Sequence, residues 1–339
     1  MSKTGVNEYT EFFTGEEWKF IKDYKKGDKV LCYDSTNGLA VVQEPLEFVH
    51  YEDDYPFLVY DNTKWFGGID YAVSFDQNMV FIDTESRKSS FLSPVEMLKD
   101  EDKVYRMIDS CYLIGGSDDS KLKNLIKLFI EVFFNDCVVS DDGGIVMQCT
   151  PFRKNEVSIA SKGKVVRRVS KVLSDMGIEC VVATGNSFVK FYCDEMVEIF
   201  KRGDIDKSWY DLSLTCRDEL KRYIFKVLGY GGTARRYRNF IELPKKSSKL
   251  CDFIQYLCFS TGSSAEIYYG KNSCILFMKY RITDSGLRSF KDTDIGDNVG
   301  YRKKLNGRGK YNFVVPSGCY MVRYRGMVFA VGDEVKEGA

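Results

Sequence analysis

The feature that most constrains the fold of this chain is an internal duplication. From about residue 120, apolar side chains recur every three or four residues, which predicts a helix. Strands, a second helix and further strands follow to about residue 205, and the same order returns over about 210–290, roughly 95 residues later. We therefore expect the interior of the chain, residues 120–300, to form an α/β domain built from two similar repeats.

The flanks of the duplication have a different pattern. Short apolar or alternating runs, separated by turns that contain glycine or asparagine, predict β-strands over the first 85 residues and again over 311–331. Residues 86–110 are transitional, and Ser93-Pro94 predicts the start of a short helix. We expect residues 1–110 and 305–339 to pair into one all-β domain that the interior interrupts.

Charge is segregated along the chain although its net value is zero. Residues 1–120 hold 12 Lys and Arg against 24 Asp and Glu, whereas residues 121–310 hold 34 against 22. An acidic segment followed by a basic one indicates two bodies, and the basic one is a candidate for binding a polyanion. A soluble charged surface without a partner is the alternative explanation.

Composition limits the remaining possibilities. With 44% hydrophobic residues, the 339-residue chain can bury sizeable cores. It contains neither an apolar stretch of membrane-spanning length nor a signal-peptide pattern, so we expect a cytoplasmic protein. The 11 cysteines form no C-x-x-C pair and the single histidine is His50, so a structural zinc site is not expected.

The two ends carry motifs in a recognisable order. Trp18-Lys19 is followed by Gly27-Asp28, Val73-Ser74 precedes Gln77, and Val315-Pro316-Ser317-Gly318 opens the final strands. Together these segments resemble the opening, the second block and the ending of a phage-type intein, which is a protein-splicing element. The resemblance covers about 110 residues at the two extremes of the chain. It implies an all-β Hint-type splicing domain formed by both chain ends.

The interior is similar to a LAGLIDADG homing endonuclease with two repeats, about 120–205 and 210–290. Residues 125–137 occupy the first motif helix, with Asp136 at its acidic end, and residues 219–233 occupy the second. There, Tyr230-Gly231-Gly232-Thr233 stands where the family commonly has Trp-Asp-Gly-Thr. The alternative is that both segments are ordinary amphipathic core helices.

The resemblance also implies that the splicing residues are degenerate. Inteins begin with Cys or Ser, polarise the first peptide bond with a histidine, and end on an asparagine that cyclises. The matching positions are Gly5, Gln77 and Asp333, with Ser74 in the second block and Glu334 after the last position. Glycine carries no nucleophile, and an ionised carboxylate cyclises far less readily than an amide. We expect splicing to be absent.

Cleavage by LAGLIDADG proteins uses one carboxylate from each motif helix to hold Mg²⁺ against the scissile phosphates. Asp136 supplies one catalytic and metal-binding carboxylate, but the mate position is Gly231. Asp218 and Glu219 lie at the wrong end of that helix, about 18 Å away. Asp136 as a surface acid that caps its helix is the alternative. We expect cleavage to be lost or limited to nicking one strand.

DNA binding needs fewer residues than cleavage does. The resemblance places strands of each repeat in the major groove, where basic side chains meet phosphates and base edges. The candidate DNA-binding residues are Arg153, Lys154, Lys162, Lys164, Arg167, Arg168, Arg235, Arg236, Arg238, Lys245 and Lys246. A solvated charged face is the alternative for each residue taken singly.

The sequence thus predicts an intein-derived, homing-endonuclease-like protein of a phage or mobile element. We expect it to bind double-stranded DNA as a monomer, to have no membrane partner, and to use Mg²⁺ if it cleaves. Three alternatives stay open. They are a catalytically dead remnant that binds DNA or serves as an interaction module, an intein with slow residual junction cleavage, and an unrelated β-plus-α/β structural protein.

Overall fold

The computed structural model describes residues 4–52, 57–60, 71–83, 88–93, 96, 105–135, 137–149, 159–202, 205–228, 240–279 and 309–333. The chain divides into two compact units, which we call unit 1 (residues 1–115 and 239–339) and unit 2 (residues 116–238). All 11 cysteines lie among the described residues and are free thiols. In the described part of the chain, no helix is long and apolar enough to cross a membrane.

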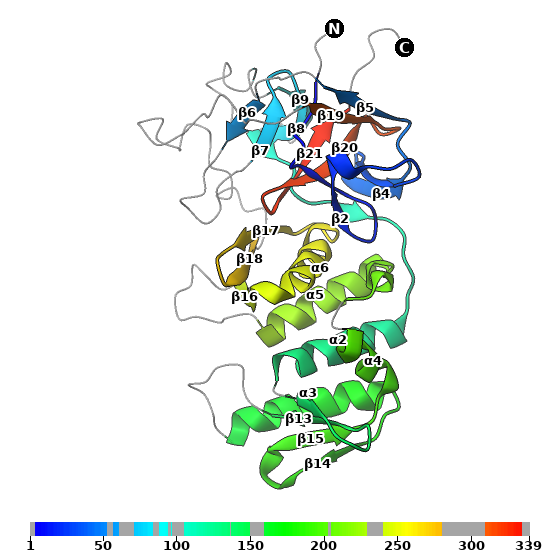
Figure 1. Ribbon diagram of the computed structural model, residues 1–339, viewed down its shortest axis with the longest axis vertical. Helices are drawn as coiled ribbons and strands as arrows, with labels where there is room; N and C mark the ends of the chain where they lie inside the picture. Colours follow the sequence, from blue (N-terminus) through cyan, green and yellow to red (C-terminus); the bar gives the residue numbers. More distant parts are fainter. Residues whose placement is uncertain are drawn as a thin grey trace, which may run out of the picture. The chain divides into compact units, whose positions relative to one another are not determined.

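Unit 1 is rich in strands, and they come from both ends of the chain (Figure 1). Its N-terminal strands are β1 (Glu11–Phe13), β2 (Trp18–Phe20), β3 (Val30–Tyr33), β4 (Leu39–Gln43), β5 (Glu47–Tyr51), β6 (Phe57–Tyr60), β7 (Tyr71–Ser74), β8 (Met79–Asp83), β9 (Ser89–Leu92), β10 (Tyr105–Met107) and β11 (Tyr112–Leu113). Its later elements are β16 (Phe240–Pro244), helix α6 (Ser248–Phe259), β17 (Ser264–Tyr269), β18 (Ser273–Lys279), β19 (Lys310–Val314), β20 (Cys319–Tyr324) and β21 (Met327–Gly332).

Strands of the two chain ends are neighbours in one sheet. Among the described residues, the largest sheet has 13 strands, and its main path runs β11-β4-β3-β20-β21-β17-β18-β16. Strand β1 lies antiparallel to β20, with Glu11 opposite Arg323, and β19 pairs with β5. In Figure 1 the blue N-terminal strands and the red C-terminal strands accordingly lie side by side. The ends of the chain therefore fold as one body.

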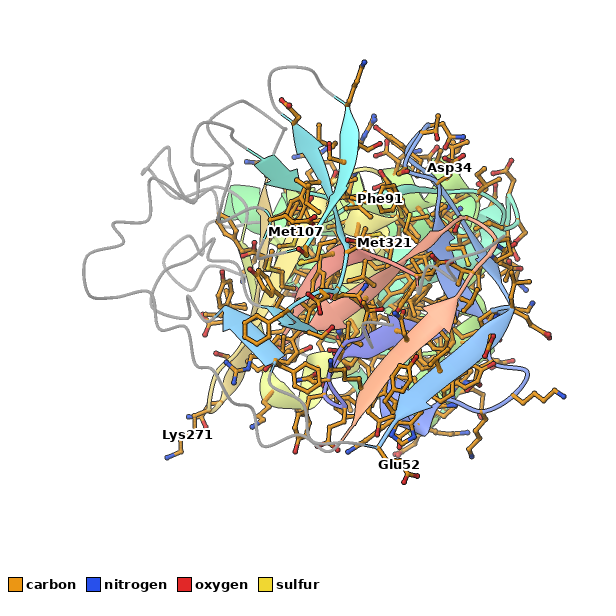
Figure 2. All side chains as sticks on the ribbon, turned by 90° about the horizontal axis from the view of Figure 1, so that it is seen from above. Asp34, Glu52, Phe91, Met107, Lys271 and Met321 are labelled. Carbon is orange, nitrogen blue, oxygen red and sulfur yellow. The ribbon has the colours of Figure 1, made fainter. Side chains whose placement is uncertain are left out.

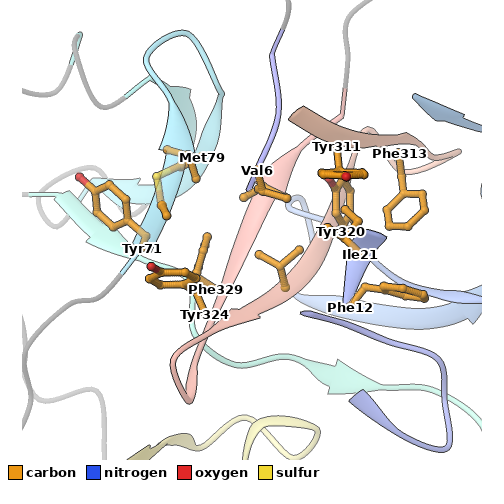
Figure 3. Close-up of a cluster of buried hydrophobic side chains, with 14 of the residues drawn as sticks. Val6, Phe12, Ile21, Tyr71, Met79, Tyr311, Phe313, Tyr320, Tyr324 and Phe329 are labelled. Atoms are coloured by element: carbon orange, nitrogen blue, oxygen red, sulfur yellow. The ribbon is translucent and has the colours of Figure 1, made fainter. Parts of the chain in front are cut away.

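The core of unit 1 is made by side chains from both ends of the chain. Phe12 contacts the ring of Phe313 with centroids 5.3 Å apart, and Phe313 contacts Tyr320 at 5.2 Å. These residues, with Val6 and Phe329, belong to one buried apolar cluster (Figure 3). Viewed from above, Glu52 and Lys271 project from the rim (Figure 2). Strands β3, β20 and β21 are buried at every position, so side chains on both of their faces are covered, unlike a strand with one face in water.

Unit 2 contains the first repeat and the first helix of the second. Its helices are α2 (Ser120–Phe134), α3 (Ile159–Asp175), α4 (Asp194–Arg202) and α5 (Leu214–Leu228). Its strands β12 (Cys137–Val139), β13 (Ile145–Gln148), β14 (Cys180–Val182) and β15 (Phe188–Phe191) form a sheet in the order β12-β13-β15-β14. Helix α2 begins where its apolar periodicity begins, because the carboxylate of Asp119 accepts a hydrogen bond from the Leu122 N–H.

Several predicted boundaries differ from those observed. The first motif helix was expected over 125–137, but α2 ends at Phe134, because Asn135 is extended (φ −109°, ψ 148°) and Cys137 begins β12. In the transitional segment 86–110, β9 and β10 are strands. The Ser93 hydroxyl accepts from the Glu96 N–H as a helix start would, but the rest of that predicted helix lies outside the described residues.

The compact units also divide the chain at other places than the predicted domains. Residues 240–279 were assigned to the interior domain together with the first repeat, whereas they cluster with the chain ends in unit 1. Strand β17 reaches β21 through the pair Glu266 and Met327. The domains 1–110 with 305–339 and 120–300 stay predictions about which segments fold independently.

Gly326 shows how tightly β17 approaches the hairpin between β20 and β21. Its φ is +85°, and a Cβ there would lie 2.1 Å from the carbonyl oxygen of Ile267. We expect Gly326→Ala to lower the free energy of unfolding by about 3 kcal/mol or more, from backbone strain and overpacking together. Equilibrium denaturation followed by tryptophan fluorescence measures the change.

Gly318→Ala is the matched control for that change. Gly318 also has a positive φ (+73°), but nothing lies within 4 Å of the added Cβ. We expect a cost of only about 1–2 kcal/mol there, from the left-handed backbone alone. Equal losses for the two variants would show that the approach to Ile267 is unimportant.

Candidate functional site

The sequence positions matched to intein junctions lie close together in unit 1. The Gly5 N–H donates to the Ser74 hydroxyl at 2.9 Å, and the Ser74 N–H donates back to the Gly5 carbonyl at 2.8 Å. Next along the chain, Val6 exchanges two backbone hydrogen bonds with Tyr311, of 2.9 and 3.0 Å. Residues 5 and 6 are thereby held between β7, which ends at Ser74, and β19.

Gln77 joins this arrangement to the end of the chain. Its side-chain amide donates to the Gly332 carbonyl at 2.6 Å and to the Asn78 carbonyl at 2.9 Å. Its carbonyl oxygen accepts from the Asn312 amide at 3.2 Å, and the Asn312 oxygen accepts from the Tyr320 hydroxyl at 2.8 Å. Gln77 and Asn312 are fully buried, so these bonds replace hydration that both amides have lost.

Asp333 stands directly after Gly332, at the end of β21. Its N–H donates to the Gly318 carbonyl at 2.9 Å, and its carboxylate accepts from the Val315 N–H at 3.3 Å. Burial raises the pKa of this carboxyl group above its usual range. The folded protein therefore binds a proton at Asp333 more readily than the unfolded chain does. The stability that this group contributes is present at low pH and is lost as the pH rises from the usual carboxyl pKa to the raised one. We call Gly5, Ser74, Gln77, Asn312 and Asp333 the junction centre.

Gly5 has no room for a side chain. A Cβ at this position would lie 2.8 Å from the carbonyl oxygen of Tyr311, 3.0 Å from its nitrogen and 3.1 Å from the Cβ of Lys310. Two of these three atoms are backbone atoms of β19, which are fixed by their pairing with β5. A cysteine or serine nucleophile would therefore require β19 to move.

The junction centre offers little chemistry for acyl transfer. Ser74 Oγ accepts the Gly5 N–H and so lies near the plane of the Thr4–Gly5 peptide, whereas attack on a carbonyl carbon comes from above that plane. Gln77 and Asn312 are neutral amides, and among the described members of the centre only Asp333 titrates as a carboxyl group. The arrangement binds the chain ends together without an activated nucleophile.

In unit 2, the two helices matched to the LAGLIDADG motifs pack against each other through polar side chains. Lys123 on α2 contacts Glu219 on α5 at 2.7 Å, and the Tyr223 hydroxyl on α5 donates to Glu131 on α2 at 2.7 Å. The two contacts join residues 96 and 92 positions apart, so both helices run in the same direction. Asp136 and Gly231, the two positions matched to the catalytic carboxylates, are 95 positions apart in the sequence, a separation between those two.

Asp136 and Gly231 themselves lie outside the described residues, as do Arg153, Lys154, Arg235, Arg236 and Arg238. Among the residues that are described, no group of three or more His, Cys, Asp or Glu side chains is arranged to hold a metal ion. The assignment of the metal to Asp136 stays a prediction.

The four basic candidates of the first repeat that are described lie on α3, not on strands. Lys164 and Arg167 are exposed, and Lys162 is partly exposed. Arg168 instead forms two hydrogen bonds of 2.6 and 3.0 Å with the fully buried carboxylate of Glu131. Its guanidinium thus neutralises a charge inside the helix packing, which favours a structural role over contact with DNA.

Lys245 and Lys246 lie in a short 3₁₀ turn, η5 (Lys245–Ser247), directly before α6, and both are exposed.

The exposed face of the four-stranded sheet was expected to be basic but is mostly apolar. Val138 and Val181 are 66% and 67% exposed there, and Tyr192 next to β15 is 55% exposed. The cation that the strands place on this face, Lys190, contacts Asp142 at 2.5 Å. Sequence reasoning missed this pair, although a lysine within an apolar alternating strand was the signal for it.

No protein-family model matches this chain, and no curated protein matches it in sequence. Two solved structures of the homing endonuclease I-DmoI are weakly similar. A set of mesophilic variants matches with 8% identity and a TM-score of 0.29 over 48% of this chain and 92% of that one. The complex of I-DmoI with DNA and Ca matches with 7% identity and a TM-score of 0.28 over 48% and 86%. Similarity at this level carries no argument about function.

The buried amide of Gln77 gives the sharpest test of the junction centre. We expect Gln77→Ala to lower the free energy of unfolding by about 2 kcal/mol, because the Gly332 carbonyl and the Asn312 amide lose a partner away from water. The exposed Gln148→Ala in β13 is the control, with a change within about 0.5 kcal/mol. Similar values for both variants, measured by urea denaturation, would contradict a tightly bonded centre.

Proposed function

We propose that this protein derives from an intein interrupted by a LAGLIDADG-type endonuclease, that it no longer splices, and that it acts by binding duplex DNA. The observation that carries the proposal is the junction centre. Gly5, Ser74, Gln77 and Asp333 were selected from sequence motifs alone, and hydrogen bonds link their surroundings across separations of 255 and 308 positions in the sequence. Such closure of both chain ends is what a splicing element with an insertion requires.

Loss of splicing follows from the space and the chemistry of that centre. Gly5 lacks a nucleophile and leaves no volume for one against Tyr311. Gln77 occupies the position of the polarising histidine and uses its amide to hold Gly332. Asp333 replaces the cyclising asparagine. Each change removes a different step, so reversal of one of them leaves the others blocked.

DNA binding is supported by charge and by the helix pair. Residues 121–310 carry a net excess of 12 positive charges, and Lys164, Arg167, Lys245 and Lys246 are exposed on the described surface. A duplex attracts such a surface mainly through its phosphates. The parallel packing of α2 and α5 agrees with the helix arrangement that the LAGLIDADG resemblance implies.

Cleavage is proposed to be absent or limited to one strand. A Mg²⁺ ion bound by Asp136 would stabilise charge on a scissile phosphate. The mate position, Gly231, supplies no carboxylate, so one ion site lacks a protein ligand. A catalytically dead DNA-binding protein is the limiting case of this proposal, and slow cleavage at one junction is the form of activity that the geometry of Gly5 favours least.

A second candidate function, that of a protein-interaction module, is favoured by one observation. The exposed sheet face that carries Val138, Val181 and Tyr192 is apolar, and the charge of Lys190 on it is neutralised by Asp142. Such a face suits an apolar protein surface better than a polyanion. Failure of this protein to bind duplex DNA even at low salt would favour the interaction module over DNA binding.

The DNA-binding proposal predicts a steep salt dependence. We expect a retarded duplex complex whose affinity falls as salt rises, with a slope in log–log form of about −0.9 for each phosphate contact. The double variant Lys164→Ala with Arg167→Ala should reduce the magnitude of that slope by one to two contacts. Lys201→Ala, an exposed lysine on α4 that contacts Glu198, is the control and should leave the slope unchanged.

The same preparations report on cleavage when Mg²⁺ and supercoiled plasmid are added. Open-circular product that Asp136→Asn abolishes would indicate nicking through Asp136, and no product would indicate a catalytically dead protein. Efficient conversion to linear DNA by the unmodified chain would contradict the proposal, because it requires a second carboxylate.

Splicing is tested by placing residues 5–333 between two reporter proteins. We expect neither ligated reporters nor a junction fragment. The triple variant Gly5→Cys, Gln77→His and Asp333→Asn should also fail, because the cysteine Cβ would meet Tyr311 in β19. A band at the summed mass of the two reporters, from the unmodified or the triple variant, would show that the geometry of the centre permits splicing after all.

A further inference from the structure

Helix α6 is buried far more completely than a helix at the edge of a domain. Of its 12 residues, nine are buried, including the polar Gln255. A surface helix buries one stripe and leaves the opposite face in water. One side of α6 is covered by strands of its own repeat, β17 and β18, so the other side must be covered by another part of unit 1.

Aromatic rings from the first strands of the chain cover that other side. Phe13 in β1 stacks on Tyr256 with centroids 5.2 Å apart and meets Phe259 edge-on at 5.8 Å. Trp18 in β2 lies 5.5 Å from the same Phe259 ring. Phe13 is completely buried, so without α6 its ring would be exposed to water.

A buried charge joins the same two elements. Arg323 in β20 is 3% exposed. Its guanidinium forms two hydrogen bonds of 2.7 Å with Glu11 in β1 and also bonds Asp252 and Gln255 in α6. The ring of Trp18 lies 4.7 Å from the same guanidinium. A buried cation requires such partners, because removal of one leaves its charge unbalanced.

Backbone hydrogen bonds close the remaining edges. The Cys111 N–H donates to Phe259 at 2.8 Å, and the Gly262 N–H donates to Cys111 at 2.9 Å. At the far side, the Gly326 carbonyl in the last hairpin accepts from the Ile267 N–H at 3.1 Å and from the Gln255 amide at 2.6 Å. Residues 240–279 are thus joined to the rest of unit 1 by aromatic contacts, by the ion pair with Arg323 and by hydrogen bonds to the backbone.

From these contacts we infer that residues 240–279 have a structural function besides any role in binding DNA. They cover the face of the chain-end strands that carries Phe13 and Arg323, which alternates with the face packed in the Phe12 cluster. The first and last strands do not bury Phe13, Trp18 and Arg323 among themselves. The inference goes beyond the proposed function and does not depend on it.

Hydrogen exchange of the full-length protein, followed by mass spectrometry, tests the inference. We expect Tyr256→Ala to leave a cavity beside Phe13 and to reduce the protection of amides in β1, β20 and β21 by at least about tenfold. Protection in β13, β15 and α3 of unit 2 should stay as in the unmodified protein. Leu173→Ala, at a fully buried position of α3, is the matched control with the reverse pattern.

A milder variant keeps the test decisive if Tyr256→Ala unfolds the protein. Asp252→Asn preserves shape and removes one charge next to Arg323, so we expect a several-fold loss of protection in β1 and β20. The inference is overturned if either variant increases exchange in β16–β18 and α6 while β1 and β20 exchange as before, because residues 240–279 would then be a dispensable appendage.

Discussion

Every part of unit 1 depends on the antiparallel pairing between the first strand of the chain and its last strands. β1 lies against β20, and Val6 exchanges backbone hydrogen bonds with Tyr311. Closing so long a loop costs conformational entropy that backbone pairing alone does not offset. The continuous cluster that contains Phe12, Phe313 and Tyr320 supplies the apolar burial that stabilises the closure. Unit 2, residues 116–238, thus lies between two sequence segments that together form unit 1.

Under the proposed function, the junction centre is a former reactive site that now has a structural role. A splicing centre needs a nucleophile with space around it and a group that polarises a peptide bond. Here the space beside Gly5 is filled by the backbone of β19, and the polarising position is held by Gln77, whose amide satisfies the Gly332 carbonyl. Amides at such positions favour stability, because they donate and accept without carrying a charge into the core.

A buried carboxylate also holds the helices of unit 2 together. Glu131 is fully buried at the centre of three helices, where Arg168 and Tyr223 satisfy its carboxylate. Once a carboxylate is bonded in this way it is unavailable to a metal or to DNA, and so is the guanidinium that neutralises it. A basic residue counted from sequence is therefore a DNA-binding candidate only where the fold leaves its charge unpaired.

Helix and strand periodicities and turn residues are local properties, so the order of the elements could be predicted from the sequence. Helices α2 and α5 overlap the ranges expected for the two motif helices, and the strands of both ends lie in the expected segments. Three features could be seen only in the folded structure: Gly5 has no room for a side chain, Arg168 binds Glu131, and residues 240–279 cluster with the chain ends. These depend on which surfaces meet, and contacts between residues far apart in sequence leave no periodic signal in it.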